Sequence, residues 1–186
     1  PFYGQVSAKS KFDLHYNASI EFNKLSLFSE SIKELEKAIA IASEKKWKEK
    51  HLESSIFMSE MMRRTNDQRK GLEILEKLSD SKKYPKLHVR KLGRMAALYA
   101  EGGEFPGRSP IDSLTKYLSV ALNIAKENKF YNEEASLSNE LGYFKLHHEN
   151  IAAAKPYLLK SAQLYKKLND INNYVNVMSH ILYIRL

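Results

Sequence analysis

Apolar residues recur along this chain at intervals of three and four positions, as in Ile32, Leu35 and Ile39 and again in Leu72 and Leu75. This period is typical of amphipathic helices, which cover a core with one apolar face. No segment alternates apolar and polar residues for long enough to indicate a strand. The pattern therefore predicts an all-α protein. The expected helices span 8–27, 29–47, 50–65, 68–80, 85–101, 110–128, 132–148, 151–168 and 171–185.

A pair made of a large and a small residue recurs on every second expected helix. The five pairs are Ala18-Ser19, Met58-Ser59, Leu92-Gly93, Leu141-Gly142 and Met178-Ser179. Each of the first four is followed by a small residue, a large residue four positions on and a third residue three further. These triplets are Ser31/Leu35/Ala38, Gly71/Leu75/Leu78, Ser113/Tyr117/Val120 and Ala154/Leu158/Ser161. The repetition predicts four helix pairs and a final helix.

The distance between the small residues of the two helices is also regular. It is 12 residues in the first, second and fourth units and 20 in the third. The extra residues fall at 101–108, where glycine and proline are frequent. We expect this insertion to be dispensable for folding. Gly93 and Gly142 are expected to let the second helix of the same pair approach closely.

These anchor residues resemble the tetratricopeptide repeat (TPR) family, which places Leu-Gly on its first helix and a small residue and an aromatic on its second. The unit length of 40 to 42 residues is similar to that of long-unit arrays in bacterial signalling proteins. The resemblance implies a right-handed α-solenoid of about four TPR-like helix-turn-helix repeats plus a final helix. It implies one superhelical domain over 1–186, as a fragment of a longer regulator.

Composition limits the possible partners more than it identifies one. The 186 residues contain no cysteine, which excludes disulfides and thiolate metal sites. The net charge of +8 permits binding to nucleic acid, to an anionic membrane or to an acidic peptide. No stretch approaches the roughly 20 apolar residues of a membrane span. Localisation stays open between a cytoplasmic and an extracytoplasmic sensor segment.

The sequence offers few candidates for chemistry. His147 and His148 are adjacent, so on a helix they point about 100° apart and do not easily share a metal ion. The Gly102-Gly103 and Pro106-Gly107 segment lacks the order of a phosphate-binding loop. We therefore expect no catalytic site, no cofactor and no metal. Nucleic-acid binding is disfavoured because most tyrosines and phenylalanines fall at positions expected to pack between helices.

The TPR resemblance implies a concave groove lined by the first helices. Positions that the family pattern turns toward this groove are Tyr16, Asn23, Lys24, Arg63, Arg64, Arg90, Arg94, Asn139, Tyr143, His147, Asn176, His180 and Tyr183. Arginine and asparagine side chains suit the carboxylates and backbone of an extended peptide. The four arginines are expected to form a positive patch that engages an acidic partner segment.

We therefore expect a non-catalytic module that binds a protein or a peptide. Its expected setting is the sensory or scaffolding segment of a bacterial signalling protein, either a sensor histidine kinase or a transcription regulator. A quorum-peptide receptor is the first alternative, and an RNA-binding helical-repeat protein is the second. The final helix carries apolar residues on more than one face, which predicts self-association through that end.

Overall fold

The computed structural model describes residues 6–101 and 110–183. Every regular element in this part of the chain is helical, which confirms the all-α prediction. The elements are α1 (Ala8–Lys24), α2 (Phe28–Glu44), α3 (Lys48–Arg64), α4 (Gln68–Glu76), the 3-10 helix η1 (Ser79–Lys83), α5 (Pro85–Glu101), α6 (Pro110–Glu127), α7 (Tyr131–His148), α8 (Ile151–Lys167) and α9 (Ile171–Tyr183).

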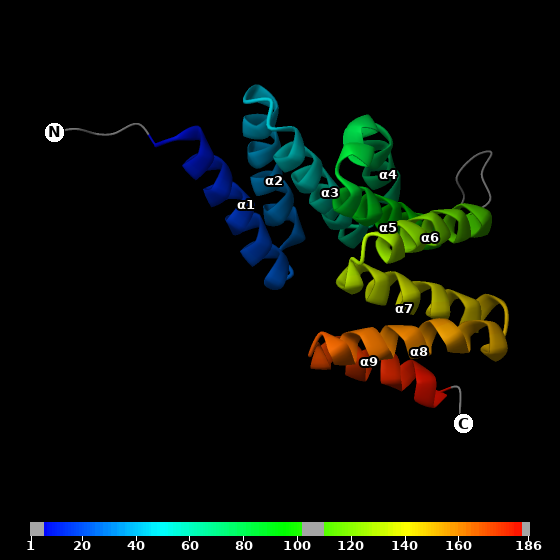
Figure 1. Ribbon diagram of the computed structural model, residues 1–186. Helices are drawn as coiled ribbons and strands as arrows, with labels where there is room; N and C mark the ends of the chain where they lie inside the picture. Colours follow the sequence, from blue (N-terminus) through cyan, green and yellow to red (C-terminus); the bar gives the residue numbers. More distant parts are fainter. Residues whose placement is uncertain (1–5, 102–109, 184–186) are drawn as a thin grey trace.

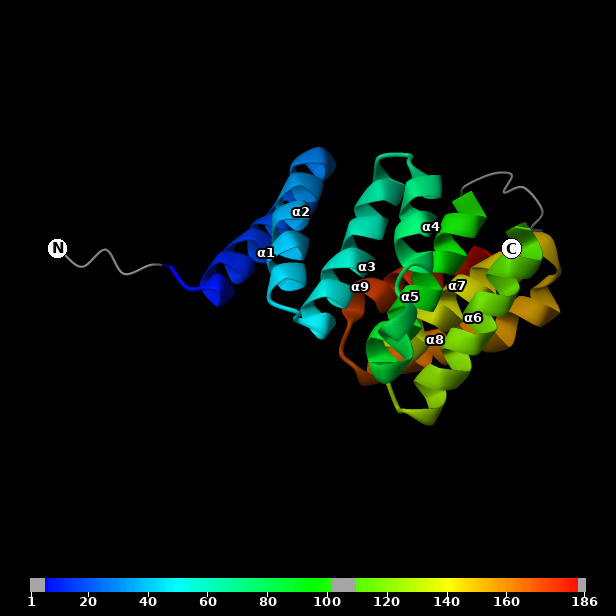
Figure 2. The same ribbon diagram turned by 90° about the horizontal axis from the view of Figure 1, so that it is seen from above.

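The helices pack in the order in which they follow along the chain. The pairs α1·α2, α3·α4, α5·α6 and α7·α8 are in contact, and each pair contacts the next through α2·α3, α4·α5, α6·α7 and α8·α9. The elements follow an arc with α1 near one end and α9 near the other (Figure 1), and neighbouring helices lie side by side (Figure 2). This is a helical-repeat-like arrangement; the right-handed solenoid stays a prediction.

Five turns between helices share one geometry. At each, a residue with positive φ, between 55° and 62°, follows the helix; these residues are Ser26, Lys46, Asn66, Lys129 and Asn169. The next amide then donates to the carbonyl five residues earlier, as from Trp47 to Ala42 at 2.8 Å and from Asp67 to Met62 at 2.8 Å. This is the Schellman closure of a helix end. Its repetition fixes the reversal from one helix to the next.

Small residues sit where two helices approach closely. A Cβ added to Gly142 would lie 2.8 Å from Cγ of Leu158 on α8, the second helix of the same pair, as predicted. Gly93 differs from the prediction, because its nearest neighbour is Leu137 on α7, not a residue of α6. In the first pair Ser31 Oγ donates to the carbonyl of Ser19 at 2.8 Å. The small anchors therefore satisfy backbone groups as well as making room.

The fourth helix is shorter than the pattern predicts. It ends at Glu76 rather than near residue 80, and η1 follows it. Just beyond this end, the carbonyl of Leu78 accepts from Lys91 Nζ on α5 at 2.8 Å, so a side chain satisfies a group that a longer helix would pair with a backbone amide. The predicted insertion lies, apart from Glu101, outside the described residues. None of the described helices is both long and apolar enough to cross a bilayer.

Candidate functional site

The inner side of the arc contains a groove with a cavity volume of about 360 Å³. We call it the concave groove. All of its lining residues come from α1, α3, α5 and α7, and they are Tyr16, Glu53, Ile56, Phe57, Glu60, Leu87, Val89, Arg90, Gly93, Arg94, Asn132, Glu133, Ser136, Leu137 and Glu140. Apolar side chains from α3, α5 and α7 therefore share this surface with a set of charged groups. The pattern is similar to that of ligand clefts, which combine apolar walls with a few polar groups.

Arg90 bridges the two helices on either side of α5. Its Nε lies 3.1 Å from Oε1 of Glu133 on α7, and its Nη1 lies 4.0 Å from Oε1 of Glu53 on α3. Lys86 Nζ lies 3.6 Å from the same Glu133 oxygen, so this 10% exposed carboxylate has two cationic partners. We call this three-helix contact the Arg90 bridge. It connects α3, α5 and α7 across the groove.

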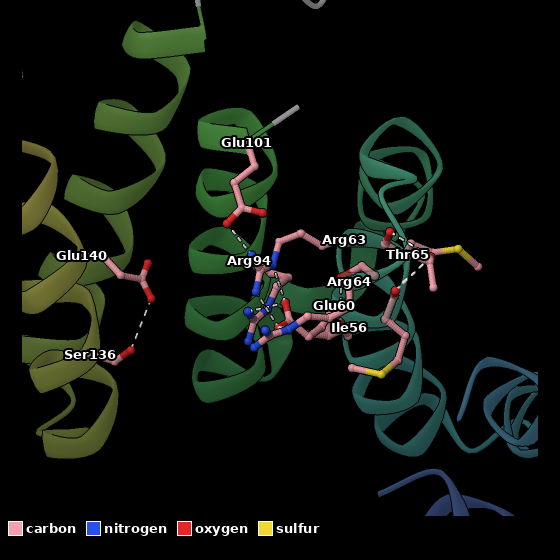
Figure 3. Close-up of polar contacts among 12 residues, drawn as sticks. Ile56, Glu60, Arg63, Arg64, Thr65, Arg94, Glu101, Ser136 and Glu140 are labelled. Atoms are coloured by element: carbon pink, nitrogen blue, oxygen red, sulfur yellow. Dashed lines mark hydrogen bonds and ion pairs between the residues drawn. The ribbon is translucent and has the colours of Figure 1, made fainter. Parts of the chain in front are cut away.

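Glu60 is the centre of a second charged group, which we call the Glu60 cluster. Its oxygens accept from Arg94 Nη1 at 2.6 Å, from Arg63 Nε at 2.8 Å and from Arg64 Nε at 3.0 Å (Figure 3). Burial opposes the charged form of Glu60, but the arginines outweigh it and hold the pKa of this carboxyl below its usual range. Glu101 also contacts Arg63, so the cluster ties α3 firmly to α5.

Glu140 on α7 lies across the groove from the Glu60 cluster (Figure 3). Much of the Glu140 residue is exposed, yet the protein atoms packed around its carboxyl desolvate the charge, and this desolvation raises the pKa of Glu140. Arg94 and the Ser136 hydroxyl act in the opposite direction. Ser136 Oγ donates to Oε1 of Glu140 at 3.3 Å. Within the described part of the chain no cationic group lies at ion-pair distance from Glu140. It is the groove carboxylate without a cation.

Tyr16 closes the α1 end of the groove. Its ring stacks on Phe12 with 5.6 Å between centroids and meets the edge of Phe57 at 6.1 Å. Burial, together with the nearby carboxylate of Glu53, raises the pKa of Tyr16 to about 12. The phenol therefore stays neutral at physiological pH and serves as a hydrogen-bond group beside Glu53.

Four other predicted contacts form a separate cluster on α7 and α9. The Tyr143 ring lies 4.3 Å from that of His147 and 5.1 Å from that of His180, between centroids. His180 Nδ1 lies 3.3 Å from Oδ1 of Asn139, and burial together with nearby His147 lowers the pKa of His180. This cluster joins α9 to α7 but does not line the concave groove.

The remaining predicted contacts lie apart from the groove lining. Asn23 and Lys24 are in the last turn of α1, where Lys24 pairs with Glu21, and Asn176 is exposed on α9. The side chain of Tyr183 lies outside the described residues. Arg63 and Arg64 act through Glu60 rather than as part of the lining. Of the thirteen predicted contacts, Tyr16, Arg90 and Arg94 line the groove.

The four arginines of the predicted positive patch are paired with carboxylates, and their engagement of an acidic partner stays a prediction. Each of the four arginines contacts a glutamate: Arg63, Arg64 and Arg94 contact Glu60, and Arg90 contacts Glu133. The carboxylates that face these arginines were not among the residues predicted from the sequence. A signal was present, because Glu53 and Glu60 are seven residues apart, as are Glu133 and Glu140. Seven residues are about two helical turns, so each pair shares one helix face.

Comparison with known proteins leaves the function open. The chain matches no family model, and it matches no curated protein sequence. Among the described residues no group of three or more His, Asp or Glu side chains is arranged to hold a metal ion. The TPR assignment and the absence of catalysis both stay predictions. The geometry of the concave groove carries the functional argument below.

Proposed function

We propose that this protein is a non-catalytic module that binds an extended segment of a partner protein or peptide in the concave groove. The observation that carries the proposal is that the first helix of each of the four pairs contributes residues to one groove. These helices are α1, α3, α5 and α7. Their polar groups are already held in place by the Arg90 bridge and the Glu60 cluster. A preformed site loses little entropy when a ligand binds.

The TPR resemblance supports the same proposal, since grooves of that family accept peptides. Two biological settings fit it. One is the sensory or scaffolding segment of a bacterial signalling protein, and the other is a quorum-peptide receptor. Both need a groove that accepts a peptide, so a test of the groove precedes a choice between them.

The test uses a displayed library of random peptides selected on the purified protein. Selected peptides are then measured against two variants, Ser136→Trp, which fills the groove, and Ser119→Trp, on α6 outside the groove lining. We expect binding to the native protein and to Ser119→Trp, with at least a tenfold loss, about 1.4 kcal/mol, for Ser136→Trp. Enrichment of no peptide, or equal binding to both variants, contradicts the proposal.

One observation favours the RNA-binding alternative. A second hollow of about 410 Å³ is lined by Trp47 and Tyr84 together with Lys46, Lys48, His51 and Lys77, and its described lining includes no carboxylate. Aromatic rings beside basic groups suit single-stranded nucleic acid. Binding of homopolymer RNA that weakens steeply with salt and is lost on Lys46→Glu and Lys77→Glu would support this function. If the variant with both substitutions binds RNA as tightly as the native chain, this hollow is not an RNA-binding site.

A further inference from the structure

The charged residues of the concave groove follow a repeated pattern across three helices. On α3 the carboxylates are Glu53 and Glu60, and on α7 they are Glu133 and Glu140, each pair seven residues apart. On α5 between them stand Arg90 and Arg94, one helical turn apart. The groove thus contains two successive levels, each with a carboxylate on α3, an arginine on α5 and a carboxylate on α7.

The two levels are not equally complete. Arg90 contacts carboxylates on both sides, at 4.0 Å to Glu53 and 3.1 Å to Glu133. Among the described residues Arg94 has one carboxylate at ion-pair distance, Glu60 at 2.6 Å, and that side chain is 11% exposed. Glu140 is left facing the groove with a hydroxyl, that of Ser136, as its hydrogen-bond donor. In the second level no described cation lies at ion-pair distance from Glu140, although Arg94 and Arg63 attract it from farther away.

The groove lining contains four glutamates and two arginines. Three further cations lie at ion-pair distance from the lining glutamates, and they are Arg63, Arg64 and Lys86. The charges in and around the groove are therefore close to balanced as a whole. Glu140 is the lining carboxylate that none of these cations reaches at ion-pair distance, so an ammonium or guanidinium group of a ligand is attracted to that point of the groove.

We propose that the concave groove binds a peptide segment that presents a lysine or arginine side chain to Glu140. This proposal rests on the proposed function and names the chemistry of the partner. The cation of the ligand completes the second level as Arg90 completes the first. Neighbouring apolar side chains of the same segment cover Ile56, Phe57 and Leu87 in the groove wall. An acidic side chain placed beside Glu140 would be repelled by it.

The structure also suggests why Glu140 is a specificity residue rather than a part of the framework. The charged groups that face it are Arg94 and Arg63, which attract it, and Glu60, which repels it. The two arginines already serve Glu60, so Glu140 contributes no ion pair to the packing of α5 on α7. Its replacement by glutamine keeps the shape and the Ser136 contact while it removes the charge. The fold is expected to be unchanged.

The test compares peptide selections on three proteins: the native chain, Glu140→Gln, and Glu127→Gln as a matched control. Glu127 is an exposed glutamate at the end of α6, outside the groove lining. The probe is a library of random eight-residue peptides, read out by residue frequency at each position. We expect lysine and arginine to be enriched at one position with the native chain and with Glu127→Gln. We expect that enrichment to disappear with Glu140→Gln.

A peptide from this selection then gives the strength of the contact. Its basic residue is changed to glutamine, and both peptides are titrated against the native chain and Glu140→Gln by fluorescence anisotropy. We expect Glu140→Gln to weaken binding of the basic peptide about tenfold or more and to leave the glutamine peptide almost unaffected. Circular dichroism and a thermal melt of Glu140→Gln establish that the variant is folded.

Four results overturn the inference. If groove-binding peptides show no preference for basic residues, or bind Glu140→Gln as tightly as the native chain, this inference fails and the proposed function stands. If no peptide is selected on any of the proteins, both fail. If saturable binding is seen for free spermidine and for no peptide, Glu140 serves a small polyamine and the peptide assignment is wrong.

Discussion

Arg94 on α5 donates to Glu60 on α3, with 2.6 Å between Nη1 and Oε2. This contact crosses from one helix pair to the next, and it lies in the wall of the concave groove. The same two residues therefore serve the stability of the repeat and the shape of the groove. Substitutions at Arg94 and Glu60 therefore test how much this contact contributes to the stability of the fold.

Arg94→Met removes one donor from a carboxylate that is mostly buried. We expect the free energy of unfolding to fall by about 1 kcal/mol, because Arg63 and Arg64 remain and Arg94 is itself partly exposed. Urea denaturation measures this. Arg69→Met is the control, since Arg69 is 87% exposed and contacts Glu73 on its own helix. Equal midpoints for the two variants would show that Arg94 does not stabilise the fold.

Glu140→Gln is expected to raise the thermal midpoint at pH 7. The surrounding protein raises the pKa of Glu140, so the folded state holds this proton more tightly than the unfolded chain. Stability from this group is therefore full below the unfolded pKa of about 4.3 and declines as pH rises through the folded pKa. The gain from the substitution should vanish near pH 4.

Glu60→Gln is the matched substitution, and its expected shift of the thermal midpoint at pH 7 has the opposite sign to that of Glu140→Gln. The arginines hold the pKa of Glu60 below its usual range, so its stabilising contribution is present above the unfolded pKa and is lost as pH falls through the lower, folded pKa. Glu60→Gln should lower the midpoint at pH 7, and its difference from the native chain should shrink in acid. If both substitutions shift the thermal midpoint in the same direction at pH 7, the assignment of charges in the groove is contradicted.

Gly142→Ala and Gly93→Ala should differ although both remove a helical glycine. Alanine gains about 1 kcal/mol of helix propensity at either position. At Gly142 the new Cβ meets Leu158 Cγ at 2.8 Å and its backbone nitrogen at 3.1 Å, so overpacking exceeds that gain and we expect a net loss of about 1 kcal/mol. At Gly93 the neighbour is the end of the Leu137 side chain, at 3.1 Å. That variant should be neutral or slightly more stable in chemical denaturation.

Self-association through α9 stays a prediction, and the structure refines its test. Val177 and Ile181 are buried against the preceding helices, whereas Ile171, Val175 and Leu182 are 71%, 59% and 56% exposed. Ile181 is therefore a packing residue and a poor probe of an interface. Val175→Lys tests the exposed face without disturbing the core. Sedimentation over a concentration series should show dimers for the native chain and monomers for the variant; a native chain that is monomeric throughout refutes the idea.

The helix boundaries were predictable because apolar spacing records which face of each helix is buried. The helix expected over 151–168, for example, is Ile151–Lys167 in the structure. The early end of α4 was not predictable, because the segment that follows it contacts the next helix, as where Lys91 donates to the carbonyl of Leu78. The Arg90 bridge was missed for the same reason, since its partners are 37 and 43 residues away. Contacts between helices depend on the angles at which the helices pack. The spacing of apolar residues within one helix does not give those angles.

The central claim, that the concave groove is the binding surface, is tested most directly by backbone amide shifts. The protein is labelled with ¹⁵N and titrated with a peptide selected on the native chain. The largest shifts are expected at lining residues on α3, α5 and α7, among them Glu53, Gly93 and Ser136. Largest shifts around Trp47 and Lys77, or on the exposed faces of α6 and α8, with the groove amides unmoved, would contradict the account.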